Sequence, residues 1–528
     1  MALLSHSVSS PAPPLWRTIP RARLIALAAL AAVLASCVPF LVCRIPGLID
    51  YPNHLARMFI LSQWDSIPDL RKFYLPEWAP LANVGMDAVV VPILWLTSWQ
   101  AETVLRDFTM ISVALTVPAV MLLSYAFHRR WSLWSVASLL FAYNYVLLYG
   151  FINYVAGINL ALIFAALWML YGNRNPLRAA LVFAPAALAL FFVHLYAFAV
   201  YGLIIGGDAL WQLIASRAEN RLALLKRQAL GFLQFLPPLF VFAVLSPMAG
   251  NAGLARMKLS TPADKAMALY SVLDIGHRGL TLLSFAVFGA VLVYGFATKR
   301  LVLARSGMVM LALLGAAFLV MPFTLFGSGF ADFRLPIVAA LVLVAATRWE
   351  NVPLRTGSAI ACGLALLALT RIAVVAVDWH QGDARYDAII HVLAPMEPGK
   401  RLLGYVAAED ATMDFARRPP IEHAPELAVL EKHAFVPTIF AEPQKQPMEF
   451  QPKVARLAFA NDIVPLYSHA FAAHGPLSPT TVSPYDYVLI FAKTPLRLPI
   501  PAYLRRIDDG SVPDLALFAV INGNPAGR

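Results

Sequence analysis

The sequence predicts an α-helical polytopic membrane protein with about 11 transmembrane helices, interfacial helices in the first outer loop and a small C-terminal α/β soluble domain. Of its 528 residues, 60% are hydrophobic and 13% are charged, whereas soluble domains carry about 25% charged residues. The mean hydropathy is +0.68. Because one soluble core could not bury so much apolar surface, this composition excludes soluble globular, disordered and disulfide-rich proteins.

The apolar segments define the predicted spans, since a bilayer crossing needs about 20 mostly apolar residues. They lie at 22–43, 107–127, 132–149, 155–172, 179–193, 195–214, 229–247, 281–298, 306–325, 333–349 and 357–378. A twelfth apolar run, 88–99, is too short to cross. Its two tryptophans, Trp95 and Trp99, suit the headgroup level, so we predict a helix lying at the interface.

Basic residues set the expected orientation. They gather in alternate loops, at Arg17 to Arg23, His128 to Arg130, Arg174 to Arg178, Arg217 to Arg227, Lys299 to Arg305 and Arg348 to Arg355. The positive-inside rule makes that side cytoplasmic, together with the N-terminus. The first loop (44–106), the 248–280 loop and the chain after 378 then lie outside. This explanation of the net charge of +11 is favoured over nucleic-acid binding.

Residues 1–378 are therefore predicted to form a transmembrane domain and residues 379–528 an extracytoplasmic α/β domain. The tail has β-type runs at 401–407, 485–492 and 515–521, separated by polar and proline-rich connections. A lipoprotein cleavage box at Leu34–Cys37 is an alternative interpretation of the first span. The apolar run continues beyond Cys37, so retention of the helix is the favoured interpretation.

The segment after the first span carries the main candidate chemistry. Asp50, Asn53, His54 and Arg57 are spaced i, i+3, i+4 and i+7, which places them on one face of a helix. Pro52 suits the first turn of that helix. Asp50 could simply cap the helix, and Arg57 could pair with a lipid phosphate or a neighbouring acid. Capping alone gives no reason for His54 and Arg57 to share the face of Asp50.

Four other residues, at three places in the chain, are candidates. Asp87 could supply a second carboxylate or cap the 88–99 helix. Asp332 and Arg334 flank Phe333 at the outer end of a span, where such residues cap, form salt bridges or bind phosphate. His194 lies deep in apolar sequence, where ionisable groups are functional candidates, although it is interfacial if a helix ends there.

These features resemble the glycosyltransferase C superfamily, which includes protein mannosyltransferases, aminoarabinose transferases and oligosaccharyltransferases. The resemblance lies in an acidic residue after the first span (Asp50), a juxtamembrane helix ending in Ala56-Arg57, an interfacial helix at 88–99 and a late helix starting at Phe333-Arg334. Many members have a paired Asp-Glu where this chain has Asp50-Tyr51, which suggests a distinct bacterial branch.

The resemblance implies transfer of a sugar from a polyprenyl-phosphate carrier to a lipid, glycan or protein acceptor, at the outer face of a bacterial inner membrane. Asp50 would be the catalytic base. His54, Arg57, Arg334, Asp87 and His194 would form the substrate and phosphate site. The need for a divalent metal ion stays open. The sequence has no Walker A or dinucleotide motif, and no nucleic-acid partner is expected.

Two other function classes remain as alternatives. A lipid-linked sugar transporter or flippase would show repeat-related halves and polar groups near the midplane, whereas the charges here gather at the outer boundary. A non-catalytic scaffold would present residues 379–528 outside the membrane. An Asp50→Asn variant separates an enzyme from a scaffold.

Overall fold

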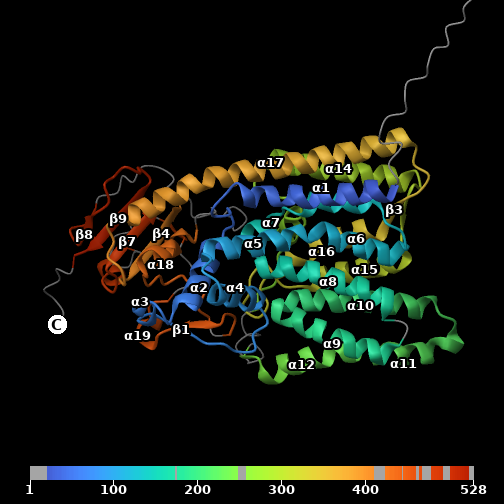
Figure 1. The fold of residues 1–528 in the computed structure, drawn as a ribbon, viewed down its shortest axis with the longest axis horizontal. Coiled ribbons are helices and arrows are strands. Elements are labelled where there is room, and N and C mark those ends of the chain that lie inside the picture. Colours follow the sequence, from blue (N-terminus) through green and yellow to red (C-terminus); the bar gives the residue numbers. More distant parts are fainter. Residues whose placement is uncertain are drawn as a thin grey trace, which may run out of the picture.

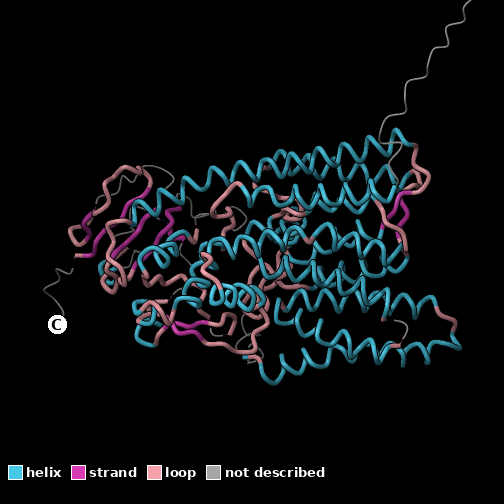
Figure 2. Tube along the Cα trace, viewed as in Figure 1, coloured by secondary structure: helices cyan, strands magenta, loops and turns pink. Residues whose placement is uncertain are grey.

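The computed structural model describes residues 21–172, 175–247, 257–408, 422–442, 444–458, 463–465, 477–491 and 500–521. Figure 1 shows a bundle of long helices with a smaller domain of strands and short helices at one end. The strands lie at two places, in that domain and at the opposite end of the bundle (Figure 2). The protein is therefore a helical polytopic membrane protein with a C-terminal sheet region.

The predicted spans are helical in the structure. Eight stretches among the described residues are long and apolar enough to cross a membrane: Ala22–Leu41, Ala101–His128, Ile152–Tyr171, Pro176–Val193, Leu195–Ala215, Ala218–Leu245, Arg278–Ala297 and Leu354–Leu393. The other three predicted spans are shorter apolar helices, at Leu133–Tyr149, Arg305–Val320 and Arg334–Ala346. The eleven predicted segments thus divide into eight of spanning length and three that are shorter.

Several of these stretches comprise more than one helix. The elements are α1 (Arg21–Leu41), α5 (Ala101–Ala114), α6 (Thr116–His128), the 3-10 helix η2 (Leu133–Phe141), α7 (Tyr145–Tyr149), α8 (Ile152–Tyr171), α9 (Pro176–Val193), α10 (Leu195–Ala215), α11 (Arg221–Phe232), α12 (Leu236–Phe240), α13 (Pro262–Tyr270), α14 (Arg278–Ala297), α15 (Arg305–Val320), α16 (Arg334–Ala346) and α17 (Leu354–Leu393). Helix α8 packs centrally, against α6, α9 and α10.

The ends of the bundle differ in character. Strands β2 (Leu301–Leu303) and β3 (Thr347–Trp349) pair antiparallel and join two of the predicted basic loops. Figure 1 shows β3 and the basic helix α11 at the end of the bundle away from the C-terminal sheet. These basic segments thus lie at the end opposite to the C-terminal domain, as the charge pattern predicts.

The C-terminal domain contains a five-stranded mixed sheet of order β6-β4-β7-β9-β8. Its strands are β4 (Leu402–Ala408), β6 (Ile463–Pro465), β7 (Tyr487–Phe491), β8 (Leu504–Arg506) and β9 (Leu515–Val520). β4 pairs parallel with β6 and β7, whereas β9 pairs antiparallel with β7 and β8. The three predicted β-type runs correspond to β4, β7 and β9 and are confirmed. Short helices α18 (Leu427–Lys432), α19 (Pro452–Ala455) and α20 (Pro479–Val482) accompany the sheet.

Helix α17 joins the two parts without a break. It has 40 residues, which at 1.5 Å per residue is about 60 Å. The predicted domain boundary at 378 falls inside this helix. The bundle therefore continues directly into the C-terminal domain, with no flexible linker between them at this point.

The first loop (44–106), predicted to lie outside the membrane, forms a unit with the C-terminal domain. It contains α2 (Tyr51–Gln63), α3 (Pro68–Arg71), β1 (Tyr74–Pro76) and the short helix α4 (Gly85–Leu96). Strand β1 pairs antiparallel with β5 (Met448–Phe450). The Tyr74 hydroxyl donates to the Ala434 carbonyl at 2.9 Å and accepts from the Val436 amide at 3.0 Å. These contacts attach the loop to the tail through a shared sheet and a buried side chain.

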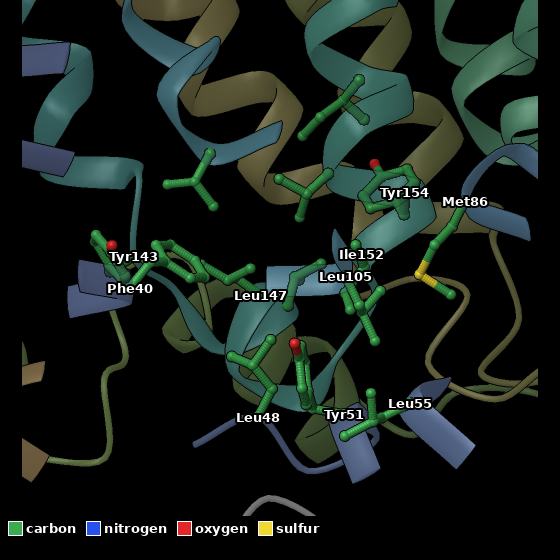
Figure 3. Packing of buried hydrophobic residues seen from close by; sticks show 14 of the residues in the cluster. Phe40, Leu48, Tyr51, Leu55, Met86, Leu105, Tyr143, Leu147, Ile152 and Tyr154 are labelled. Atoms are coloured by element: carbon green, nitrogen blue, oxygen red, sulfur yellow. The ribbon is translucent and has the colours of Figure 1, made fainter. Parts of the chain in front are cut away.

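The apolar face of α2 is buried against the bundle. Leu48, Tyr51 and Leu55 lie beside Leu147 and the start of α8 (Figure 3), and all four side chains are fully buried. α2 packs on α4 and α5, and also on α18 of the C-terminal domain. Because α2 lies between the bundle and that domain, its polar face is enclosed as well.

Candidate functional site

Asp50 lies directly before α2, and Pro52 occupies the first turn of the helix, as predicted. The Asp50 backbone amide donates to the carbonyl of Tyr149, at the C-terminal end of α7, at 3.0 Å. The residue is only 6% exposed. Its side chain makes no capping hydrogen bond to the helix. Helix capping therefore does not explain why a carboxylate occupies this buried position.

Gly150 makes this close approach of two chain segments possible. Its φ of +109° lies in the region that L side chains avoid, and a Cβ there would come within 2.6 Å of the Asp50 Cβ. The Gly150 carbonyl oxygen lies 3.2 Å from His54 Nε2. One glycine thus packs on Asp50 and contacts His54, two of the predicted site residues.

His54 is held as a neutral side chain. Its Nδ1 atom is buried without a hydrogen-bond partner, and its ring contacts Phe440 edge-on at 5.6 Å. Burial holds the pKa of His54 well below its usual range, and the charges of Arg57 and His423 act in the same direction. At neutral pH His54 therefore contributes a polar ring without a positive charge.

The C-terminal domain contributes two side chains that the sequence analysis did not select. His423 Nε2 lies 3.6 Å from Asp50 Oδ1, and His423 Nδ1 lies 3.3 Å from Glu426 Oε1. Both residues are buried, with exposures of 4% and 0%. The imidazole of His423 thus lies between two carboxylates, one from the outer loop and one from the tail.

Asn53, also on the polar face of α2, attaches this pair to the helix. Its Nδ2 donates to Glu426 Oε1 at 3.2 Å and to the Thr438 carbonyl at 2.9 Å. Its Oδ1 accepts from the Phe440 amide at 2.7 Å. With every polar atom of its amide engaged, Asn53 connects the bundle and the C-terminal domain next to Asp50.

Arg57 and Asp87 form a buried bidentate ion pair with each other. Arg57 Nε lies 2.7 Å from Asp87 Oδ1, and Nη2 lies 3.2 Å from Oδ2. The two side chains are 1% and 0% exposed. The pair joins α2 to α4. Asp87 lies in the first turn of α4, but its carboxylate is directed to Arg57 and not to the helix end. Arg57 Nη1 has no hydrogen-bond partner among the described residues.

Arg334 is a buried cation at the start of α16, with 5% exposure. Its guanidinium carbon lies 4.4 Å from the Phe151 ring centre and 4.7 Å from that of Tyr196. Nη1 donates to the Gly329 carbonyl at 3.1 Å, and Nε has no hydrogen-bond partner. In the part of the chain that the structure describes, Arg334 makes no ion pair with a carboxylate. The Asp50 carboxylate is one of the charges that act on it.

Asp332 does not pair with Arg334, although the two flank Phe333. Its Oδ2 accepts from Ser260 Oγ at 2.6 Å and lies 3.3 Å from Lys265 Nζ. The ammonium group of Lys265 also donates to the Phe318 carbonyl at 2.6 Å. Asp332 therefore anchors the start of α13 and the residues just before it, and its carboxylate is not paired with Arg334.

His194 occupies the junction of α9 and α10. Its Nδ1 accepts from the Tyr196 amide at 3.1 Å and so caps α10. The ring contacts Tyr154 and Tyr196, and the latter ring also faces Arg334. The structure thus brings His194 next to Arg334, at a helix end, as the interfacial interpretation proposes.

The predicted residues form three neighbouring groups. Asp50 and His54 meet at Gly150, Arg334 and His194 share an aromatic environment, and Arg57 and Asp87 pair separately on α2 and α4. Chemically, the arrangement offers a buried carboxylate beside a histidine and a guanidinium that pairs with no carboxylate among the described residues. Within the described ranges, no group of three His, Cys, Asp or Glu side chains is arranged to hold a metal ion.

No protein-family model and no curated protein matches the sequence. Among solved structures, ArnT from Cupriavidus metallidurans bound to undecaprenyl phosphate is similar over 96% of this chain and 99% of that chain, at 12% identity and a TM-score of 0.43. The arabinofuranosyltransferase AftD from mycobacteria is similar over 95% of this chain, at 14% identity and a TM-score of 0.44. This chain spans 40% of the length of that AftD chain. The chain is thus similar in structure to these two proteins over about 95% of its length, at low sequence identity.

Proposed function

We propose that this protein is an integral membrane glycosyltransferase that moves a sugar from a polyprenyl-phosphate carrier to an acceptor at the extracytoplasmic face of a bacterial inner membrane. The observation that carries the proposal is the buried Asp50 carboxylate at the junction of bundle and C-terminal domain, 3.6 Å from His423 Nε2 and within electrostatic range of Arg334. The similar ArnT structure, which holds undecaprenyl phosphate, agrees with a carrier of this class.

In the proposed reaction, the Asp50 carboxylate and the Arg334 guanidinium have separate roles. Asp50 accepts the proton of the acceptor hydroxyl as that oxygen bonds to the anomeric carbon of the sugar. The bond from that carbon to the carrier phosphate breaks, and its electron pair stays on the phosphate oxygen. Arg334, which pairs with no carboxylate in the described part of the chain, stabilises the negative charge on the departing phosphate. His54 and His194, held beside these groups, contribute polar contacts to the substrates.

The direct test is turnover of lipid-linked sugars by the purified full-length chain. A panel of undecaprenyl-phosphate-linked pentoses and hexoses is incubated with the protein in lipid nanodiscs, together with candidate lipid, glycan and protein acceptors, and release of undecaprenyl phosphate is measured. Asp50→Asn keeps the shape of the side chain and removes the base, so we expect turnover to fall at least about 100-fold. Asp65→Asn, at an exposed position just after α2, is the matched control and should retain wild-type turnover.

Two results would count against the proposal. A wild-type protein that releases no carrier phosphate from any donor is not this kind of enzyme. Full turnover by Asp50→Asn, at a wild-type unfolding temperature, would remove Asp50 from the chemistry. An Arg334→Gln variant then locates the phosphate contact, because its loss should lower kcat as well as raise the KM for every donor, irrespective of the sugar.

A further inference from the structure

The C-terminal domain places one titratable side chain against the proposed catalytic base. His423 and Asp50 face each other at 3.6 Å, and both are buried. His423 belongs to the turn that begins the short 3-10 helix η9 (Ala424–Glu426). Its ring also contacts Phe440 edge-on at 5.1 Å. The imidazole is therefore fixed by its own helix and by an aromatic neighbour, with Nε2 directed at Asp50.

Glu426 holds the other side of the ring. Two donors meet at its Oε1, Thr438 Oγ1 at 2.7 Å and Asn53 Nδ2 at 3.2 Å, and His423 Nδ1 lies 3.3 Å from the same oxygen. Asn53 Nδ2 also lies 3.2 Å from His423 Nδ1. Such convergence suits an ionised carboxylate, because each donor stabilises the negative charge. A carboxylate thus faces each ring nitrogen of His423, and both nitrogens can donate when the ring is an imidazolium.

A purely structural role does not account for this arrangement. The two parts of the protein are already joined beside it by Asn53, which bonds to Thr438 and Phe440, and by the pairing of β1 with β5. Neither connection requires an ionisable group against Asp50. A histidine enclosed by two acids is costly to bury, which favours a role in the chemistry. The other titratable ring near it is His54, whose pKa responds to the His423 charge.

We propose that His423 is a positioning residue for Asp50, with Glu426 fixing the orientation of the imidazole. This inference rests on the proposed function and extends it. With Nε2 3.6 Å from Asp50 Oδ1, the His423 ring attracts one oxygen of the Asp50 carboxylate electrostatically, so that the other oxygen meets the acceptor hydroxyl. In the transfer step the hydroxyl proton passes to Asp50, the acceptor oxygen bonds to the anomeric carbon, and the carrier phosphate leaves with the electron pair. His423 keeps its own protons throughout. The C-terminal domain thereby completes the active site.

Two amide variants separate positioning from structure. The amide nitrogen of His423→Gln reaches the place of Nε2 and retains a donor for Asp50. The shorter His423→Asn places its amide near Nδ1 and retains the contact with Glu426 only. His433→Asn is the matched control, because His433 lies in the same domain with a φ of 52°, a conformation that asparagine accepts.

We expect His423→Asn to lower kcat about 100-fold, the cost of a catalytic group misplaced by about 1 Å, with little change in the KM for the lipid-linked donor. His423→Gln should stay within about tenfold of wild type, since a neutral donor replaces a charge-assisted one. Both variants, like His433→Asn, should keep the wild-type unfolding temperature and resistance of the C-terminal domain to limited proteolysis.

Three other results would each contradict the positioning role of His423, and they can be told apart. If His423→Asn turns over donor like wild type while Asp50→Asn does not, His423 has no part in the reaction and the proposed function stands. If both amide variants lose turnover equally and the C-terminal domain becomes protease-sensitive, the role of His423 is structural. If the wild type turns over no donor in the panel, the proposed function fails and this inference fails with it.

Discussion

Breaking the buried pair of Arg57 and Asp87 should destabilise the protein strongly. The two side chains make two hydrogen bonds, at 2.7 and 3.2 Å, and are 1% and 0% exposed. Arg57→Met leaves the Asp87 carboxylate buried without its partner, which costs about 3–5 kcal/mol. Removing both charges, with Arg57→Met and Asp87→Leu together, leaves no orphaned ion. We therefore expect the double variant to recover most of the lost free energy of unfolding.

The measurement is SDS-induced unfolding in mixed micelles, followed by tryptophan fluorescence, for wild type, both single variants and the double variant. Arg71→Met, at an exposed position in α3, is the control and should change the free energy of unfolding by less than about 0.5 kcal/mol. If Arg57→Met leaves stability unchanged but raises the KM for the lipid-linked donor, Arg57 is a phosphate ligand, as the family resemblance implies. The structural interpretation of the pair would then be wrong.

Two further predictions concern the surroundings of Asp50. Gly150→Ala adds a Cβ at φ +109°, 2.6 Å from the Asp50 Cβ, so it should cost about 1–3 kcal/mol and displace the carboxylate; unaltered turnover and unfolding would contradict the close approach. His54 has a pKa well below that of the unfolded chain, because of burial first and then the charges of Arg57 and His423. The unfolded state therefore binds the proton more readily, and stability should decline as the pH falls below about 6.5. Unfolding measured from pH 7.5 down to pH 5 should show a shallower decline for His54→Asn, and equal slopes would refute this assignment.

The helical bundle was predictable because spans and strands are local patterns. The polar face of α2 also follows from spacing alone, since residues three and four apart are neighbours on a helix. Its apolar side, with Tyr51 and Leu55, is buried. The domain boundary was harder to predict from the sequence. The composition changes near residue 378, whereas helix α17 continues to Leu393.

The partners of that polar face could not be predicted from the sequence. Asn53 meets His423 across 370 residues of chain, and Arg57 meets Asp87 across 30. The histidines after residue 378 do not have the spacing of metal ligands. Spacing along the chain can reveal a metal site, but it cannot reveal a contact between distant segments. A histidine three residues before a glutamate, as at His423 and Glu426, was the available signal. It is too common to select a site until the fold brings Asp50 alongside.

The pairing of β1 with β5 has a consequence for how the protein is made. The Tyr74 hydroxyl, in β1, bonds to the Ala434 carbonyl, which lies 360 residues further along the chain, and β5 follows Ala434. Neither contact can form until these residues have been synthesised. At about 5–20 residues per second, synthesis of that stretch takes roughly 20–70 s. During this interval the outer loop has no sheet partner, and its strand edge is open to wrong pairing. Completion of the outer loop is therefore a late event in biogenesis, and a chain that stops before Met448 ends its synthesis with that edge uncovered.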